Sequence, residues 1–394
     1  MDHIKAKLQK EVDALEPELK KLSYRIHAHP EVGWEEQNAS RWITEYLEDG
    51  GFHIERGICG LPTAFRASYG TGKPVIAFLS EYDALPDIGH GCGHNIIASA
   101  AVGAGMASRL ISDQWSTTIL VMGCPAEELL GGKVILVEKG AFDDVDAALM
   151  VHPLGEEGNW AGMKSTASVS LEVEYWGRQS HAAVDPWNGI NALGALLLAF
   201  NNIHALQLYF RDRTRINGII KDGGKAVNVI PEYALGSFMI RTPKDTYLDQ
   251  LIEKVIQCFE AAAHATGAHL EYRKGLRCAT MHSNAVLLGL WKKNMEILGR
   301  KVGDINDSSA STDMGNVSLA VPSIHPFLSI SREPMSFHTR EFAAAAVSDA
   351  GRKAMADGAK GLAMTAVDIV TQPRVLCRIK EEFEEMSREF QGII

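Results

Sequence analysis

Three short apolar runs, each followed by polar side chains, constrain the fold of this chain more than any other feature. They are Val75–Leu79, Thr118–Met122 and Ala147–Val151. Their continuous apolar character predicts strands buried on both faces of a sheet. Helical stretches lie between them, at about 96–112, where Asn95 is the expected N-cap, and at 131–140. The alternation predicts an α/β fold with a doubly wound, mostly parallel sheet.

Each run delivers chemically capable side chains at its carboxyl end, where ligands bind in such sheets. The residues are Asp83, Cys92 and His94 after the first run, Glu127 and Glu128 after the second, and His152 after the third. A thiolate and an imidazole in one turn suit zinc. One carboxylate of an adjacent pair can bind a metal while the other acts as a base. Taken singly, these residues are equally compatible with a buried structural cysteine and histidine and with solvated carboxylates.

Length and composition set the class of protein. A chain of 394 residues predicts two domains. The net charge of -10, without a basic cluster, argues against nucleic acid and anionic membranes as partners. The polar amino terminus does not resemble a signal peptide, and we expect no membrane-spanning run. Six scattered cysteines lack the spacing of a disulfide framework, so we expect reduced thiols and a cytoplasmic protein.

The amino-terminal region is predicted to be helical. Apolar spacing indicates a helix over 4–28, with a kink or break at Pro17, and an amphipathic helix over 38–50. His27 and His29 lie in a His-Ala-His-Pro segment between these helices. Metal binding is an alternative for this pair, but a packed turn is the favoured interpretation.

The pattern changes after Lys164 and predicts a smaller domain, 165–283, inserted into a larger one, 1–164 and 284–394. The predicted order is strand, helix, two strands, helix, strand, at 168–175, 188–206, 214–221, 226–241, 245–266 and 269–273. This βαββαβ order indicates a ferredoxin-like α+β domain. Beyond it we expect a helical region from Asn284, a buried strand at 321–329 and a closing alanine-rich helix over 342–369.

Nine ordered segments resemble the M20 metallopeptidase and amidohydrolase family, and within it the aminoacylase-like amidohydrolases. They begin at Ile26, Asp83, Gly91, Pro125, Val151, Ser180, Asn228, Ser311 and Phe337. The pattern Glu-Tyr-Asp-Ala-Leu-Pro at 81–86, with Gly-His-Asn at 93–95, is most similar to the branch of p-aminobenzoyl-glutamate hydrolase subunits and β-alanyl-lysine-type dipeptidases. Two positions depart from wider family patterns. Asn95 replaces a common Asp, and Glu81 replaces a His of peptidase members.

The resemblance implies roles for particular residues. It implies two divalent metal ions per subunit, zinc or manganese, with the ligands Cys92, His94, Glu128, His152 and His338. It implies that Glu127 is the general base and that Asp83 orients a ligand. The inserted domain would act as a lid and pair with its copy in a homodimer. Asn228 and Arg241 match positions that hold the substrate's carboxylate, and His181 matches one that reaches the partner's active site.

These observations predict a metal-dependent amidohydrolase. Its substrate would be a small-molecule amide between an acyl or aryl-acyl group and an amino-acid-like amine. A dipeptidase, an aromatic deaminase and a non-catalytic metal-binding protein are the alternatives. Glu127 beside Glu128 argues against the last, because a binding-only protein needs no base. A nucleotide-binding protein is disfavoured, since the first strand is not followed by Gly-x-Gly-x-x-Gly or Gly-Lys-Ser/Thr.

Overall fold

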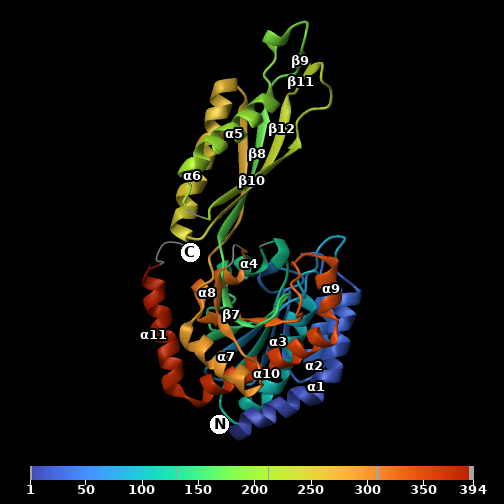
Figure 1. The fold of residues 1–394 in the computed structure, drawn as a ribbon, viewed down its shortest axis with the longest axis vertical. Helices are drawn as coiled ribbons and strands as arrows, with labels where there is room; N and C mark the ends of the chain where they lie inside the picture. The colour runs from blue at the N-terminus through green and yellow to red at the C-terminus, as the bar shows by residue number, and fades with distance from the viewer. Residues whose placement is uncertain (1, 130, 212, 308–309, 390–394) are drawn as a thin grey trace.

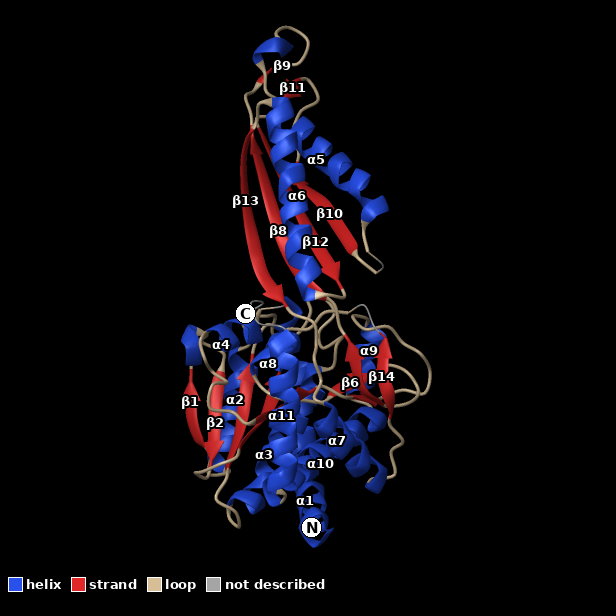
Figure 2. Cartoon of the chain, turned by 90° about the vertical axis from the view of Figure 1, so that its left-hand side faces the viewer, coloured by secondary structure: helices blue, strands red, loops and turns tan. Residues whose placement is uncertain are grey.

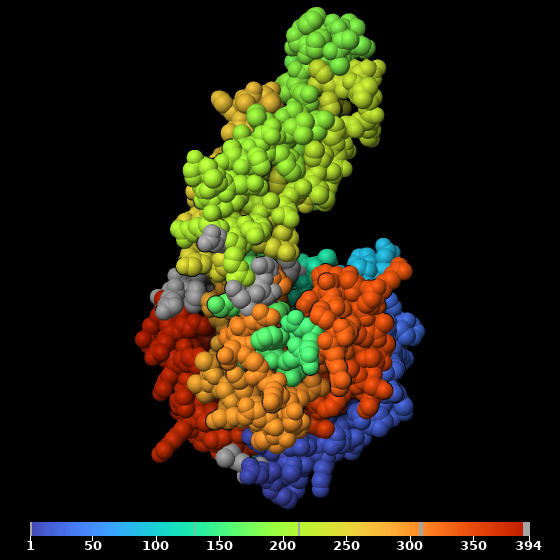
Figure 3. All heavy atoms as spheres, viewed as in Figure 1, coloured from blue at the N-terminus to red at the C-terminus, as the bar shows by residue number. Residues whose placement is uncertain are grey.

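The computed structural model describes residues 2–129, 131–211, 213–307 and 310–389. A larger domain contains both ends of the described chain, and a second domain projects from it (Figure 1). Figure 3 shows that the second domain extends well beyond the body of the first.

The larger domain is built on a six-stranded sheet. Its order is β1 (His53–Arg56), β2 (Phe65–Tyr69), β4 (Thr118–Cys124), β3 (Val75–Glu81), β5 (Ala147–Leu149) and β15 (Ser323–Ile324). The four strands from β4 to β15 are parallel to one another, whereas β2 is antiparallel to both β1 and β4. The predicted mostly parallel sheet is therefore confirmed, with an antiparallel pair at one edge.

Helices cover both faces of this sheet, as the doubly wound prediction requires. Ile76 and Phe78 of β3 face a core shared with α1 (Asp2–Ala28), α3 (His94–Ser112) and α10 (Asp349–Thr371). Val75, Ala77 and Leu79 face a second core, which includes α4 (Gly132–Glu138) and α8 (Met314–Ala320). The remaining helices of this domain are α2 (Gln37–Asp49), α7 (Ala285–Ile297), α9 (Arg340–Ala346) and α11 (Pro373–Glu389), with the 3-10 turns η1 (Ile58–Gly60) and η2 (Glu127–Leu129).

A small second sheet lies beside the main one and carries a proposed metal ligand. Its order is β14 (Gly303–Asp307), β7 (Trp160–Lys164), β16 (Phe327–Ser329) and β6 (His152–Leu154). His152 begins β6, and only two residues separate it from the end of β5. The predicted buried strand at 321–329 is divided between β15 and β16, which belong to different sheets.

The inserted domain is ferredoxin-like, as predicted. Its antiparallel sheet has the order β10 (Arg215–Asp222), β12 (Tyr233–Thr242), β8 (Ala167–Trp176), β13 (His269–Cys278). The helices α5 (Ala192–Leu206) and α6 (Asp245–Thr266) pack on one face (Figure 2). At the far tip, β9 (Ser180–His181) pairs with β11 (Val229–Ile230) near η3 (Pro186–Asn188), and η4 (Gln207–Tyr209) follows α5.

Three local predictions were wrong. The cap of α3 is Gly93, and Asn95 lies inside the helix, where its side chain donates to Ser23 Oγ across 2.9 Å. Pro17 does not break α1, which continues through it to Ala28. The alanine-rich helix is interrupted at Val347, because Ser348 caps a new helix, and α11 follows it.

The segment Ala192–Tyr209 is long and apolar enough to meet the length and composition criteria for a membrane span, contrary to our expectation. Only 28% of it is buried. Its buried side chains, such as Leu196 and Ala199, pack into the core of the inserted domain. A core helix can meet the same criteria, so this finding is weak support for a membrane span.

Candidate metal centre and active site

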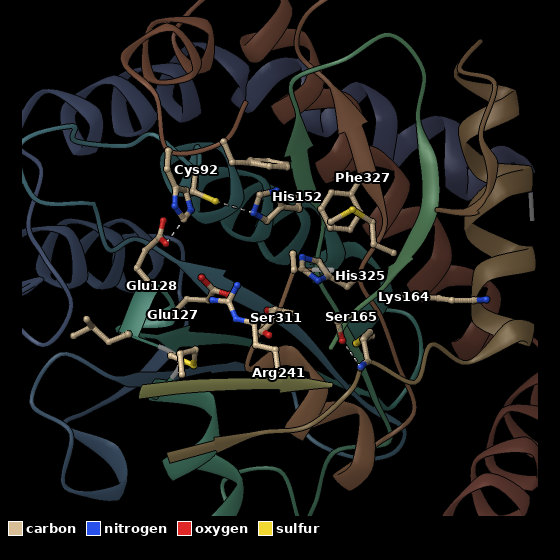
Figure 4. A pocket seen from close by; sticks show the side chains of 18 residues that line it. Cys92, Glu127, Glu128, His152, Lys164, Ser165, Arg241, Ser311, His325 and Phe327 are labelled. Atoms are coloured by element: carbon tan, nitrogen blue, oxygen red, sulfur yellow. Dashed lines mark hydrogen bonds and ion pairs between the residues drawn. The ribbon is translucent and has the colours of Figure 1, made fainter. Parts of the chain in front are cut away.

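The carboxyl ends of β3, β4 and β5 bring the predicted ligands together. Cys92 lies in the turn before α3, Glu128 lies in η2 after β4, and His152 lies at the start of β6. Their potential ligand atoms form overlapping groups, each within 4.8 Å, which are Cys92–His94–His152, Cys92–Glu128–His338 and His94–Glu127–Glu128. Residues from each of these groups line one side of a pocket of about 430 Å³ (Figure 4).

Asp83 connects two of the candidate ligands. Its Oδ1 lies 2.8 Å from His94 Nδ1, and its Oδ2 accepts a 2.9 Å hydrogen bond from the backbone N–H of Glu128. The carboxylate thus fixes the imidazole and the turn that carries the two glutamates. This geometry suits the predicted orienting role, because the opposite ring nitrogen remains available to a metal.

The residues present fit a divalent metal ion. His94 Nε2 and Glu128 Oε1 are buried and have no hydrogen-bond partner among the described residues. Cys92 Sγ lies 3.5 Å from His152 Nε2, and His338 Nε2 lies 3.3 Å from Glu128 Oε2. Converging thiol, imidazole and carboxylate groups form a donor set that binds zinc and similar ions.

Glu127 and Glu128 are adjacent but occupy different electrostatic environments. Burial raises the pKa of Glu127 well above its usual value, and the nearby Glu81 and Asp313 raise it further. Burial also opposes ionisation of Glu128, but hydrogen bonding from His338 and the charge of His94 lower its pKa overall. The ionised group is thus Glu128, while Glu127 has an increased affinity for a proton.

Two residues at the site have left-handed backbone conformations that are unfavourable for side chains other than glycine. Ala126, directly before Glu127, has φ of 55°, and its N–H donates to the buried Glu36 carboxylate across 2.8 Å. His338 has φ of 62°. The surrounding fold therefore holds two backbone positions under strain, namely the residue before the candidate base Glu127 and the candidate ligand His338.

Comparisons with known proteins identify the family. A model of the peptidase dimerisation domain of the M20 family matches residues 163–267. The chain is 37% identical to the Homo sapiens Xaa-Arg dipeptidase and 35% identical to the Mus musculus Xaa-Arg dipeptidase. These alignments cover 97% and 99% of this chain and 92% and 94% of the relatives. The chain belongs to the M20 family.

Other M20-related comparisons agree with this assignment. One of the p-aminobenzoyl-glutamate hydrolase subunits of Escherichia coli is 34% identical over 70% of this chain and 62% of its own length. A dinuclear metal-binding M20 peptidase from Bacillus subtilis shares the fold, with a TM-score of 0.66 at 19% identity over 91% of this chain and 99% of its own. This chain is therefore an enzyme of the M20 family, a metal-dependent amide hydrolase.

The opposite wall of the pocket in this M20 enzyme carries Arg241 from β12. Figure 4 shows its side chain projecting into the pocket that the metal-ligand groups line. Its Nε is buried and has no hydrogen-bond partner among the described residues. Most of the surrounding wall is apolar, with Met163, Met239 and Phe327 among its residues. An anionic group on an otherwise apolar ligand would complement this wall.

His181 and Asn228 lie at the far tip of the inserted domain, so one chain does not bring them to the ligand cluster (Figures 1 and 2). His181 pairs with Val229 in the β9–β11 ribbon, and Ala182 N–H donates to the Asn228 carbonyl. Asn228 is therefore remote from Arg241 within one chain. Both tip residues are exposed.

The prediction from the sequence did not include several buried polar residues that lie behind the ligand cluster. Lys133 lies 2.5 Å from both Glu81 and Asp313, and His325 lies beside His152 with ring centroids 5.5 Å apart. A sequence signal exists for Lys133, a charge directly before the apolar run 134–137 of α4. In contrast to these missed residues, His27 and His29 bond to backbone carbonyls. His27 lies in the last turn of α1 rather than in the predicted turn after it.

Proposed function

We propose that this M20 enzyme hydrolyses amides in which an acyl or aryl-acyl group is joined to an amino acid with a free carboxylate. The observation that carries the proposal is Arg241, which faces the metal-ligand cluster across one largely apolar pocket. A guanidinium group binds a carboxylate through two parallel hydrogen bonds. Such binding would place the amide of the substrate between Arg241 and the metal centre.

The names of several relatives support an amino-acid moiety in the substrate. They include an Xaa-Arg dipeptidase, a p-aminobenzoyl-glutamate hydrolase and, in Bacillus subtilis, an N-acetyl-L-cysteine deacetylase. The last is 27% identical over 67% of this chain. Dipeptides with a basic carboxyl-terminal residue therefore belong in any substrate panel, beside acyl and aryl-acyl amino acids.

The proposed chemistry assigns separate tasks to the two adjacent glutamates. Cys92, His94, His152, Glu128 and His338 would hold two divalent ions, and zinc or manganese would polarise the scissile carbonyl and make water more acidic. Glu127 would accept a proton from the attacking water and return it to the leaving amine. The raised pKa of Glu127, which burial causes, gives this carboxylate a greater affinity for a proton than an ordinary glutamate has, and this suits a group that takes up and returns a proton.

His181 is proposed to act in the active site of a partner subunit. Its Nδ1 accepts hydrogen bonds of 3.2 Å from the backbone N–H groups of Ala183 and Val184. The neutral imidazole must then carry its proton on Nε2, which becomes a fixed donor. A donor of this kind can stabilise the oxyanion that develops from the scissile carbonyl.

A homodimer through the inserted domain is part of this proposal. The match to a peptidase dimerisation domain supports it. Exposed apolar side chains support it as well, including Ile219 on the sheet-edge strand β10 and Trp187 beside His181. We also propose a cytoplasmic location, which the lack of a disulfide-framework spacing among the six cysteines of the sequence supports.

The test is a hydrolysis screen with the metal-depleted protein reloaded with zinc or manganese. The panel contains N-acyl amino acids, aryl-acyl glutamates and dipeptides, each paired with its carboxamide, which lacks the free carboxylate. We expect metal-dependent hydrolysis of at least one acid and much slower hydrolysis of its carboxamide. Equal rates for acid and carboxamide would contradict the proposed substrate class.

A further inference from the structure

A buried lysine and glutamate lie directly behind the candidate metal ligands, and the proposed mechanism does not use them. Glu81 ends β3 with its side chain only 1% exposed. Its Oε1 lies 2.5 Å from Lys133 Nζ, which is also fully buried. Its Oε2 points the other way and lies 3.6 Å from His94 Nε2.

The hydrogen bonds of His94 show which of its ring nitrogens can bind a metal, and this nitrogen is the one that lies near Glu81 Oε2. His94 Nδ1 lies 2.8 Å from Asp83 Oδ1 and 3.0 Å from the Asp83 carbonyl oxygen. Both of these oxygens are acceptors, so Nδ1 carries the hydrogen. Nε2 is therefore the ring nitrogen that can bind a metal, in place of a proton, and it faces Glu81.

Three carboxyl groups surround this nitrogen. Besides Glu81 Oε2 at 3.6 Å, Glu127 Oε2 lies 3.9 Å and Glu128 Oε1 lies 4.0 Å from His94 Nε2. His94 Nε2 and Glu81 Oε2 are both buried and have no hydrogen-bond partner within the described parts of the chain. Buried polar atoms that converge in this way need a positive charge among them, which a proton on Nε2 or, in the metal-loaded protein, a metal ion supplies.

We propose that Glu81 is a third carboxylate of the metal centre and that Lys133 is the positioning residue that holds it there. Lys133 uses one oxygen of Glu81 and leaves the other directed at the position that His94 Nε2 faces. The proposal deepens the metal dependence of the proposed function, but it concerns metal binding and does not depend on the substrate.

Asp313 anchors Lys133 on its other side. Its Oδ1 lies 2.5 Å from Lys133 Nζ, and its Oδ2 accepts a 2.8 Å hydrogen bond from the Lys133 backbone N–H. The start of α4 and the residue before α8 are thereby tied together. Lys133 thus has a fixed position. Its contact with Glu81 therefore fixes the orientation of the Glu81 carboxylate.

The first experiment measures metal stoichiometry by elemental analysis and affinity by chelator competition, using zinc and manganese. We expect Glu81→Gln to lower the affinity about 10- to 100-fold, as is typical when a group that supports a metal site is lost. Glu138→Gln, which removes an exposed carboxylate at the end of α4, is the control and should bind metal as the wild type does. Wild-type affinity and stoichiometry in a folded Glu81→Gln variant would overturn the proposal.

The second experiment measures the rise in Tm that metal produces. Lys133→Met leaves Glu81 and Asp313 without a cation in the metal-free protein, so metal should raise its Tm more than that of the wild type. Glu81→Gln should show a smaller rise than the wild type. A purely structural ion pair would leave both rises unchanged, and that result would overturn the proposal.

The double variant Glu81→Gln/Lys133→Met removes one charge of each sign and keeps the test decisive if Lys133→Met does not fold. We expect it to bind metal as weakly as Glu81→Gln does. Wild-type affinity in the double variant would overturn the proposal. Because these measurements use no substrate, a failed hydrolysis screen would contradict the proposed function and leave this inference standing.

Discussion

At the scale of single residues, one step along the chain separates two chemical environments in η2. Glu128 receives the His338 contact and donates its backbone N–H to Asp83, whereas Glu127 is flanked by the carboxylates of Glu81 and Asp313. Adjacent residues of a tight turn point in different directions. The same residue type can therefore serve two purposes at consecutive positions.

We predict that Glu127→Gln keeps its metal and loses activity, whereas Glu128→Gln loses metal and activity together. The first variant removes a proton acceptor, which contributes about 100-fold or more to kcat. The second variant removes a negatively charged carboxylate from the groups of candidate metal ligands. Metal content and kcat, measured on the same preparations, check both results. An active Glu127→Gln variant with full metal content would place the base elsewhere.

Arg241 allows a separate test at this scale. We expect Arg241→Ala to raise KM for free-carboxylate substrates about 10- to 100-fold, which corresponds to about 1.5–3 kcal/mol for hydrogen bonds to a charged group. Hydrolysis of the matched carboxamides should change little. Arg241→Lys keeps the charge but not the paired geometry, so it should recover only part of the loss. Equal effects on acids and carboxamides would contradict carboxylate binding.

At the scale of secondary-structure elements, Asp146 connects the central strand β3 with α11. Its Oδ2 accepts a 2.8 Å hydrogen bond from Val75 N–H, and its Oδ1 lies 2.5 Å from Lys380 Nζ. Burial raises the pKa of Asp146, but the contacts with Lys380 and Val75 outweigh it and lower the pKa overall. The ionised form is therefore favoured in the folded protein.

This shift predicts a pH-dependent effect of Asp146→Asn. A lowered native pKa stabilises the fold above the unfolded value of about 3.9, and this contribution is lost as the pH falls through the native pKa. We expect the variant to lose about 1 kcal/mol of unfolding free energy at pH 7, because Lys380 is half exposed and screened. Denaturant unfolding at pH 7 and below pH 4 checks this. A difference that does not shrink at low pH would contradict it.

At the scale of the whole molecule, the tip of the inserted domain lies far from the ligand cluster of its own chain. His181 is held by its own turn, and Trp187 nearby is 77% exposed. Strand β10 forms an open edge of the sheet, where Ile219 is exposed as well. A second copy of the chain would give all three features a partner.

We predict that His181→Ala folds, dimerises and binds metal but is nearly inactive, since one lost oxyanion donor costs about 3 kcal/mol. Mixing it with inactive Glu127→Gln should restore part of the activity. One site of the mixed dimer then contains both an intact base and an intact partner histidine. Exchange of subunits should be verified by mass. Exchange without recovered activity would contradict a role across the dimer.

Local patterns in the sequence determined much of this fold. The buried strands at 75–79, 118–122 and 147–151 were predictable because side-chain burial on both faces leaves a continuous apolar run. The carboxyl ends of parallel strands share one edge of the sheet, so the meeting of Cys92, Glu128 and His152 followed from the order of elements. The βαββαβ order likewise determined the ferredoxin-like domain.

Only the tertiary structure decided which distant groups pair. Lys133 and Asp313 are 180 positions apart, and the apolar run that follows Lys133 gives no indication of its partners. The division of 321–329 between two sheets also depends on neighbouring strands rather than on its own residues. Hydrogen bonds and ion pairs depend on distances of a few ångströms, which the packing of whole elements sets. For this reason the sequence predicted the ligand cluster but not the Glu81–Lys133 pair behind it.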